Sequence, residues 1–160
     1  MATDRIALIT GGMGGLGEAI AVRLHAQGHR VAVTHSLGNP HVGAWLAEQQ
    51  THGRDFQAFA VDVADYEACQ RCAAEVVAKV GPVDILVNNA GITQDVTFKR
   101  MTLEAWRHVL ATDLDSVFNM TKPLYDGMIA RGWGRIINIS SVNGSKGAFG
   151  QTNYSAAKAG

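Results

Sequence analysis

The sequence predicts an α/β fold in which helices cover both faces of a parallel sheet. Short apolar segments alternate along the chain with longer segments whose apolar residues recur at helical spacing. Consecutive parallel strands need a crossover connection, which is usually a helix, so this alternation favours a doubly wound parallel sheet. The length of 160 residues, with 47% hydrophobic and 18% charged residues, fits one globular domain with one core.

The first strand and the first helix have the clearest boundaries. The apolar segment 5–10 ends at a run of glycines, as a strand buried on both faces would. Ile20, Ala21 and Leu24 then recur at helical spacing, and Gly28 is a typical helix stop. The first unit is therefore a strand, a glycine loop and a helix.

The same alternation continues along the rest of the chain. It predicts strands at 30–35, 56–61, 83–88 and 135–140, and helices at 44–50, 66–80, 103–131 and 151–160. Helix 103–131 carries an apolar stripe made of Trp106, Val109, Leu110, Leu114, Val117 and Phe118. Asp113 falls on this stripe, where a carboxylate must be paired or hydrogen-bonded.

Composition excludes several classes of partner. Fourteen basic and fourteen acidic residues give a formal net charge of zero, so we expect no nucleic acid and no anionic membrane as partners. No apolar run approaches the roughly 20 residues that cross a bilayer, and we expect a cytoplasmic protein. Cys69 and Cys72 lie inside a predicted helix without a second cysteine pair, so we interpret them as buried thiols. His25 and His29 are separated by Gly28, which ends their helix, and we expect no metal site.

A glycine-rich segment joins the first strand to the first helix. It reads Thr10-Gly11-Gly12-Met13-Gly14-Gly15-Leu16-Gly17, and it fits both GxGxxG and TGxxxGxG. Glycines let the backbone approach a phosphate, and the helix N-terminus offers free N–H groups and the positive end of its dipole. The segment indicates a Rossmann-like site for the pyrophosphate of a dinucleotide; by itself it also fits a glycine-rich turn without a ligand.

Three further groups follow the predicted strands. Asn88-Asn89-Ala90-Gly91 ends the fourth strand, Asn138-Ile139-Ser140-Ser141 ends the fifth, and Tyr154-Ser155-Ala156-Ala157-Lys158 opens the last helix. Open parallel sheets bind ligands at the carboxyl ends of their strands, so one cleft can collect all three groups. Tyr154 and Lys158 share one helix face, where an ammonium would stabilise a phenolate and make Tyr154 a candidate proton donor.

Together these motifs resemble the short-chain dehydrogenase/reductase family. The resemblance rests on TGxxxGxG at 10–17, NNAG at 88–91, a serine thirteen residues before the tyrosine, and YxxxK at 154–158, in this order along the chain. It implies that Tyr154 protonates a substrate carbonyl oxygen as hydride arrives from a nicotinamide. It also implies that Ser141 hydrogen-bonds that oxygen, and that Lys158 tunes Tyr154 and holds the cofactor's ribose.

Asp113 departs from the pattern of this family, which usually has asparagine at that place. A negative charge near Lys158 would partly cancel the pull of the ammonium on Tyr154. Two interpretations stay open: a catalytic role in which Asp113 supports Lys158, and a structural buried carboxylate.

The loop after the second strand favours NADP(H) as cofactor. It reads Thr34-His35-Ser36-Leu37-Gly38-Asn39-Pro40-His41 and lacks the acid that NAD sites use for the adenosine ribose, but it offers no Arg or Lys for a 2′-phosphate. Asp62-Val63 occupies the place where the family contacts adenine. The expected cofactor-binding residues are Gly11, Gly12, Gly15, Leu16, Gly17, Ser36, Asp62, Val63, Asn89, Ala90, Gly91, Tyr154 and Lys158.

Three segments, 91–95, 132–135 and 143–153, are similar to those of acetoacetyl-CoA reductases of polyhydroxybutyrate synthesis, a group within this family. The similarity implies NADPH-dependent reduction of a short 3-oxoacyl-CoA to the (R)-3-hydroxyacyl-CoA. The expected substrate-binding residues are Asp95, Ser141, Phe149, Gln151 and Tyr154; loop packing is the alternative for Asp95, Phe149 and Gln151. A 3-oxoacyl-[acyl-carrier-protein] reductase shares the same motifs and reaction, and a nucleotide-binding module without turnover is the alternative from another class.

The last expectation concerns the extent of the domain. We expect residues 1–160 to be a dinucleotide-binding domain that ends within the helix carrying Tyr154 and Lys158. The usual dinucleotide sheet has a sixth strand, so we expect the C-terminal strands to be missing and the sequence to be a piece of a longer enzyme; a true truncation is the alternative. The resemblance also implies a homotetramer in the full-length protein, assembled through helix 103–131 and the helix that carries Tyr154.

Overall fold

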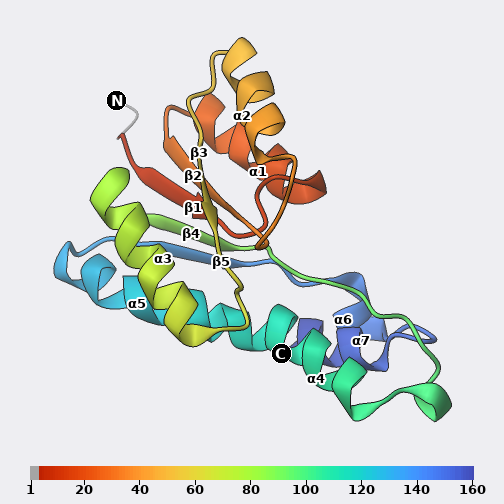
Figure 1. Cartoon of the computed structure of the whole chain (residues 1–160). Helices are drawn as coiled ribbons and strands as arrows, with labels where there is room; N and C mark the ends of the chain where they lie inside the picture. Colours follow the sequence, from red (N-terminus) through yellow and green to blue (C-terminus); the bar gives the residue numbers. More distant parts are fainter. Residues whose placement is uncertain (1–3) are drawn as a thin grey trace.

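The computed structural model describes residues 4–160, which form a five-stranded parallel sheet in the order β3-β2-β1-β4-β5. The strands are β1 (Ile6–Ile9), β2 (Arg30–His35), β3 (Gln57–Ala60), β4 (Ile85–Asn88) and β5 (Arg135–Asn138). The helices are α1 (Gly15–Ala26), α2 (Val42–Thr51), α3 (Tyr66–Lys79), α4 (Leu103–Leu110), α5 (Ser116–Ala130), α6 (Val142–Lys146) and α7 (Thr152–Ala159). Helices α1 and α2 lie over one face of the sheet, and α3 and α5 lie over the other (Figure 1). The predicted Rossmann-like, doubly wound α/β fold is confirmed.

The central strand β1 is buried on both of its faces. Successive side chains of a strand point to opposite sides of the sheet, so Leu8 packs in one core with Val76 and Met120, while Ile9 packs in a second core with Ala21. This double burial explains why the first strand is continuously apolar rather than alternating. It also holds the carboxyl ends of the central strands level at one edge of the sheet.

The predicted helix 103–131 is confirmed as a continuous helical segment over Leu103–Ala130, but it is not α-helical throughout. A π-helical turn, Ala111–Asp115, joins α4 to α5 and contains Asp113. A π turn inserts one residue into the helical ladder, and an apolar stripe read at α-helical spacing does not reveal it. The short helix α6 and the 3-10 turn Phe98–Arg100 were not predicted, because segments this short carry no periodicity.

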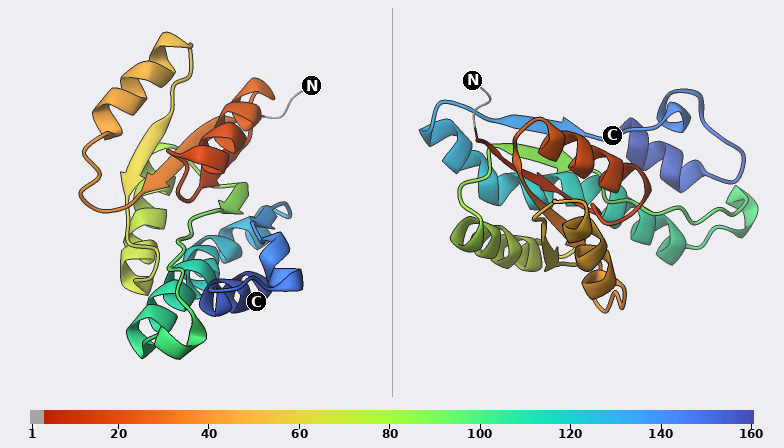
Figure 2. Two further views of the ribbon diagram at one scale, coloured as in Figure 1. Left: turned by 90° about the vertical axis from the view of Figure 1, so that its right-hand side faces the viewer. Right: turned by 90° about the horizontal axis from the view of Figure 1, so that it is seen from above.

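Helices α4, α6 and α7 lie beyond the carboxyl ends of the strands, where α7 packs against both α4 and α6 (Figures 1 and 2). Helix α7, which carries Tyr154 and Lys158, therefore lies on the side of the sheet where the strands end. No helix within residues 4–160 has the length and apolar character needed to cross a membrane.

Candidate active site

The glycine loop between β1 and α1 depends on glycine at specific positions. Gly11 has a φ of +61°, in the left-handed region that favours glycine. A Cβ on Gly17 would collide with the carbonyl oxygen of Gly11 and lie 2.7 Å from Asn89 Nδ2. The free N–H groups at the N-terminus of α1 therefore border a compact turn into which a phosphate can approach.

Thr10 and Asn89 connect this loop to the end of β4. The Thr10 hydroxyl accepts hydrogen bonds from the backbone N–H groups of Asn89 and Ala90, both at 2.9 Å. In return, Asn89 Nδ2 donates to the carbonyl oxygens of Thr10, at 2.9 Å, and Gly11, at 3.2 Å. The Asn89 side chain thus shapes the glycine loop, while Ala90 and Gly91 face the adjoining hollow.

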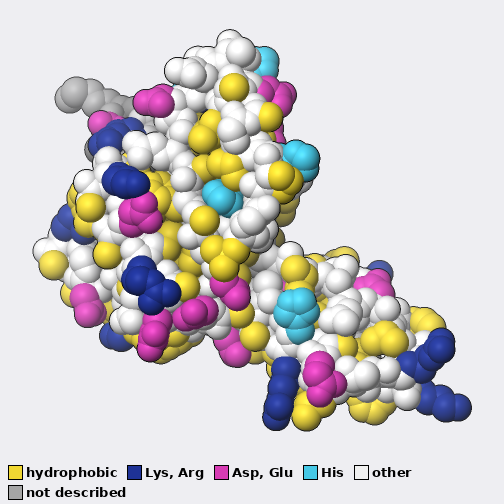
Figure 3. All heavy atoms as spheres, viewed as in Figure 1, with side chains coloured by type: hydrophobic (Ala, Val, Ile, Leu, Met, Phe, Trp, Pro, Cys, Tyr) yellow, Lys and Arg dark blue, Asp and Glu magenta, His cyan; other side chains and the backbone are white. Residues whose placement is uncertain are grey.

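This hollow, of about 490 Å³, lies beside the glycine loop. Its lining includes the expected cofactor residues Gly11, Ser36, Asp62, Val63, Ala90 and Gly91, so the ends of four strands, β1 to β4, meet there. The volume lies within the range of small-molecule sites. Among the lining residues within 4–160, His35 and His108 are the basic side chains. In the space-filling view, hydrophobic and histidine side chains border the indentation between the sheet and the α4 region (Figure 3).

A second hollow continues from the first toward α7. It is lined by Leu16, Asn89, Gly91, Ile92, Thr93, Ile139, Ser140, Tyr154 and Lys158. The two hollows share Gly91 and Ile92. The two hollows therefore adjoin each other at the end of β4, between the glycine loop and the Tyr154–Lys158 face of α7. An elongated ligand lying across the strand ends could reach both of them. We refer to the two hollows together as the cleft.

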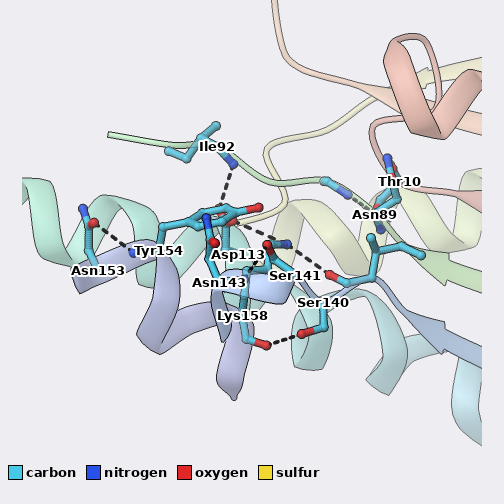
Figure 4. Close-up of polar contacts among 12 residues, drawn as sticks. Thr10, Asn89, Ile92, Asp113, Ser140, Ser141, Asn143, Asn153, Tyr154 and Lys158 are labelled. Atoms are coloured by element: carbon cyan, nitrogen blue, oxygen red, sulfur yellow. Dashed lines mark hydrogen bonds and ion pairs between the residues drawn. The ribbon is translucent and has the colours of Figure 1, made fainter. Parts of the chain in front are cut away.

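Lys158 reaches into this cleft from α7 and is held from two sides. Its Nζ donates to the carbonyl oxygen of Ile139 at 3.2 Å and lies 3.5 Å from Asp113 Oδ2 (Figure 4). The same Nζ is 5.8 Å from the centroid of the Tyr154 ring. The predicted placement of Tyr154 and Lys158 on one helix face is what brings the ammonium and the phenol together.

Asp113 is buried, with 4% of its surface exposed. Its Oδ1 accepts a hydrogen bond from the Ile92 N–H at 2.8 Å, while Oδ2 makes no hydrogen bond and faces Lys158. Burial raises the pKa of this carboxyl, and the Ile92 N–H and the Lys158 ammonium act in the opposite direction. A Cβ on Gly91 would lie 2.8 Å from Asp113 Oδ2 and 3.1 Å from Lys158 Nζ, so glycine is needed beside this pair.

Ser141 lies at the junction of β5 and α6, on the same side of the cleft as Tyr154 and Lys158 (Figure 4). It caps α6, because its Oγ accepts a hydrogen bond from the Asn143 N–H at 3.2 Å. A serine hydroxyl that accepts one bond keeps its own proton for another acceptor. The hydroxyl proton can therefore bond to a ligand oxygen, but the serine that lines the second hollow is Ser140 and not Ser141.

The loops expected to contact a substrate are joined to each other. Gln151 Nε2 donates to Asp95 Oδ2 at 2.9 Å, and Gln151 Oε1 accepts from Asn143 Nδ2 at 2.8 Å. These three side chains form a polar chain that links the loops, and none of them is among the residues that line the two hollows. Phe149 is 93% exposed, and the structure does not bring it into contact with the other candidate residues.

Asn153 is a structural contributor that sequence reasoning missed. It is fully buried; its Nδ2 donates to the carbonyl oxygens of Gln94 and Ala105, both at 3.3 Å, and its Oδ1 accepts from the Tyr154 N–H at 2.9 Å. These bonds fix the first turn of α7 to α4 and to the preceding loop, and so position Tyr154. Its one sequence signal is a carboxamide directly before the tyrosine, which does not indicate burial.

The remaining titratable clusters do not form a second site. Within residues 4–160, no three His, Cys, Asp or Glu side chains come together as metal ligands. Cys69 and Cys72 are buried in α3, as predicted. Burial raises the pKa of the Cys69 thiol to about 12 and that of Cys72 to about 11, so neither is a reactive thiolate.

The fold is a Rossmann-like α/β fold with a glycine loop at the edge of the sheet where the strands end. A profile of the short-chain dehydrogenase family matches residues 5–160, and the chain belongs to that family. It is 53% identical to acetoacetyl-CoA reductase of Cupriavidus necator over 158 residues, which cover 99% of this chain and 64% of that protein. It is 52% identical to acetoacetyl-CoA reductase of Rhizobium meliloti, over 98% of this chain and 63% of that protein. It is 40% identical to 3-oxoacyl-[acyl-carrier-protein] reductase of a Synechocystis strain, over 99% of this chain and 64% of that protein.

The chain thus spans somewhat less than two thirds of the length of these relatives. The family resemblance read from the four motifs is confirmed. The geometry of the site and the family membership are the basis of the function proposed for this protein.

Proposed function

We propose that residues 1–160 are the dinucleotide-binding domain of an oxidoreductase that reduces a short 3-oxoacyl-CoA to the (R)-3-hydroxyacyl-CoA with NADPH. The observation that carries this proposal is the pair Tyr154 and Lys158, which lines the cleft beside the glycine loop. The names of the Cupriavidus and Rhizobium relatives support acetoacetyl-CoA as substrate, and hence a role in polyhydroxybutyrate synthesis.

The residues of this chain supply the proton and the orientation for such a reduction. A reduced nicotinamide bound in the cleft would supply hydride to the carbonyl carbon. The Tyr154 hydroxyl gives its proton to the carbonyl oxygen, so that hydride and proton together convert the ketone to an alcohol. The Ser141 hydroxyl donates to the same oxygen and holds it beside Tyr154, while the Lys158 ammonium favours the phenolate that Tyr154 becomes.

The cofactor proposal rests on the lining of the cleft. The glycine loop and the N-terminus of α1 suit a pyrophosphate, and Asp62 and Val63 border the space for an adenine. NADP is favoured over NAD because β2 ends at His35 and is followed by Ser36, so that no carboxylate stands at the place expected for the adenosine 2′ position. Competition between the two cofactors in binding titrations tests this choice.

A 3-oxoacyl-[acyl-carrier-protein] reductase is the second candidate, and the Synechocystis relative favours it. Both reactions use the same cleft and differ only in the carrier of the thioester. Specificity constants, kcat/KM, measured with acetoacetyl-CoA and with an acetoacetyl-acyl carrier protein separate the two.

We further propose that the full protein works in the cytoplasm as a homotetramer with an acyl-CoA as its small-molecule partner. Support for self-association comes from α5, where Phe118 and Ile129 are each 62% exposed. Exposed large apolar side chains on one helix are typical of a protein interface. Light scattering on the purified protein measures the number of copies.

The activity is tested by following NADPH absorbance with acetoacetyl-CoA after the intact mass of the purified protein has been measured. We expect Tyr154→Phe to lower kcat by at least about 100-fold, the usual contribution of a general acid, with NADPH affinity nearly unchanged. Tyr125→Phe, the same chemical change on the exposed side of α5, is the control and should keep full activity. Retained turnover in Tyr154→Phe would refute the proposed mechanism, and NADPH binding without any wild-type turnover would favour the non-catalytic module.

A further inference from the structure

The cleft contains a buried pair of opposite charges. Asp113 is 4% exposed, and the side chain of Lys158 is 7% exposed. Burying a single charge is costly, whereas a paired carboxylate and ammonium compensate each other. The pair joins the π-helical turn to α7, two elements that are far apart in the sequence.

Each group packed around Asp113 has a defined relation to it. From the loop after β4, the Ile92 N–H donates to Oδ1 at 2.8 Å. From α7, the Lys158 ammonium faces Oδ2 at 3.5 Å, and from α4 His108 is the weakest of the groups that favour the ionised carboxylate. Because Oδ2 makes no hydrogen bond, the ammonium is its strongest partner.

The same ammonium is also the nearest cation to Tyr154, 5.8 Å from the ring centroid. Any group that holds Lys158 in place or neutralises its charge therefore affects Tyr154 indirectly, through the ammonium. A carboxylate and an amide have almost the same shape, so the difference between Asp and Asn at position 113 is a difference in charge at this place.

We propose that Asp113 is a positioning residue for Lys158: its carboxylate anchors the ammonium beside Tyr154 and cancels much of its charge, which sets the pH range in which Tyr154 donates its proton. This proposal rests on the proposed function for its catalytic consequence. Its structural half, an ionised Asp113 paired with Lys158, stands independently of any activity.

The first test compares pH–rate profiles of the full-length enzyme. In Asp113→Asn, Lys158 keeps an uncompensated positive charge that favours the phenolate. We therefore expect the limb of the profile that reports Tyr154 to move by about one unit toward lower pH. A merely structural role would lower the rate at every pH without moving the limb, and an unmoved limb would overturn the proposal.

Asp84→Asn is the matched control. Asp84 also pairs with a cation, Arg131, at 3.4 Å and also accepts a backbone N–H, from Ile6 at 3.2 Å, but it precedes β4 at the opposite end of that strand from the cleft. The chemical change is the same, and we expect the profile to stay where the wild type has it. An equal shift in both variants would mean that the effect is global, and would also overturn the proposal.

The second test needs no activity and uses the pH dependence of unfolding. Burial raises the pKa of Asp113 in the folded protein. In the unfolded protein this carboxyl loses its proton at about pH 4. Between that pH and the higher pKa of the folded state, the native protein therefore retains a proton that the unfolded protein has released. The stability of the wild type relative to Asp113→Asn should therefore fall as the pH rises through this window, by at most about tenfold in the unfolding constant per pH unit.

The outcomes of the two tests distinguish the two proposals. Burial alone would also produce this pH dependence, so Lys158→Gln tests the pair itself, and it also serves if Asp113→Asn does not fold. Without the ammonium, Asp113 ionises less readily, so the fall in stability should extend to higher pH than in the wild type. That extension in a protein without reductase activity would retain the charge pair and reject the proposed function, whereas a fall over the same pH range in both proteins would reject the charge pair.

Discussion

Replacing Thr10 by valine would remove the one hydroxyl that joins the end of β1 to the end of β4. Thr10 is 2% exposed, and its Oγ1 accepts from the N–H groups of Asn89 and Ala90, both at 2.9 Å. Valine has nearly the same shape, so Thr10→Val leaves both partly buried N–H donors without their protein partner. The perturbation is therefore a loss of hydrogen bonding with little change in packing.

The expected cost follows from the number of stranded donors. A buried N–H left without its partner costs about 1–3 kcal/mol, which gives about 2–6 kcal/mol for two. The bonds from Asn89 Nδ2 to the carbonyl oxygens of Thr10 and Gly11 do not involve the hydroxyl and keep the two strand ends together. We therefore expect the lower half of that range, about 2–4 kcal/mol of the free energy of unfolding.

Urea unfolding followed by circular dichroism measures this loss, with Thr10→Ser as the matched control. Serine keeps the hydroxyl and loses only a buried methyl group, which costs about 1 kcal/mol. The expected order of stability is threonine, then serine, then valine, and dinucleotide affinity should fall in the same order. A valine variant as stable as the serine variant would show that the hydroxyl does not hold the glycine loop.

Two further predictions concern the glycine loop and the buried thiols. Gly17→Ala should weaken NADPH binding at least about tenfold, because its Cβ would meet the Gly11 carbonyl oxygen and Asn89 Nδ2; Gly14→Ala, where a Cβ meets nothing within 4 Å, should bind normally in the same fluorescence titration. Cys69 and Cys72, with pKa values raised to about 12 and about 11 by burial, should not react with a thiol reagent at pH 8 in the native protein and should both react once it is unfolded in urea. Rapid modification of either thiol without unfolding would contradict the burial found in α3.

Much of the fold and of the cleft could be predicted from the sequence, because both depend on features that are local along the chain. An apolar segment followed by glycine or asparagine marks the carboxyl end of a strand. Parallel pairing then brings those ends to one edge, as the register of β1 with β2 and β4 shows. The glycine loop, the end of β4 and the pair on α7 were therefore expected to meet, and they line connected hollows.

The side-chain partners within the cleft could not be predicted, because they join residues remote in sequence. Thr10 and Asn89 are 79 positions apart, and Asn153 bonds to the carbonyl oxygen of Ala105, 48 positions away. Helical spacing placed Asp113 on an apolar stripe and showed that it needed a partner, but not which one. The π-helical turn at Ala111–Asp115 inserts one residue into this helical segment, and no periodic pattern in the sequence reports such a turn.

Asp113 shows why this limit affects mechanism as well as fold. From the sequence, a carboxylate could act near Lys158 or serve only as a buried structural group, and both interpretations predict the same helix. The structure brings its Oδ2 to 3.5 Å from Lys158 Nζ, without any hydrogen bond to divert it. Unless it is protonated, a carboxylate in that position interacts electrostatically with the ammonium that stabilises the Tyr154 phenolate. The protonation state of the Asp113 carboxyl therefore decides whether the positive charge of Lys158 is compensated during the reaction. The paired pH measurements on Asp113→Asn and Asp84→Asn test that protonation state.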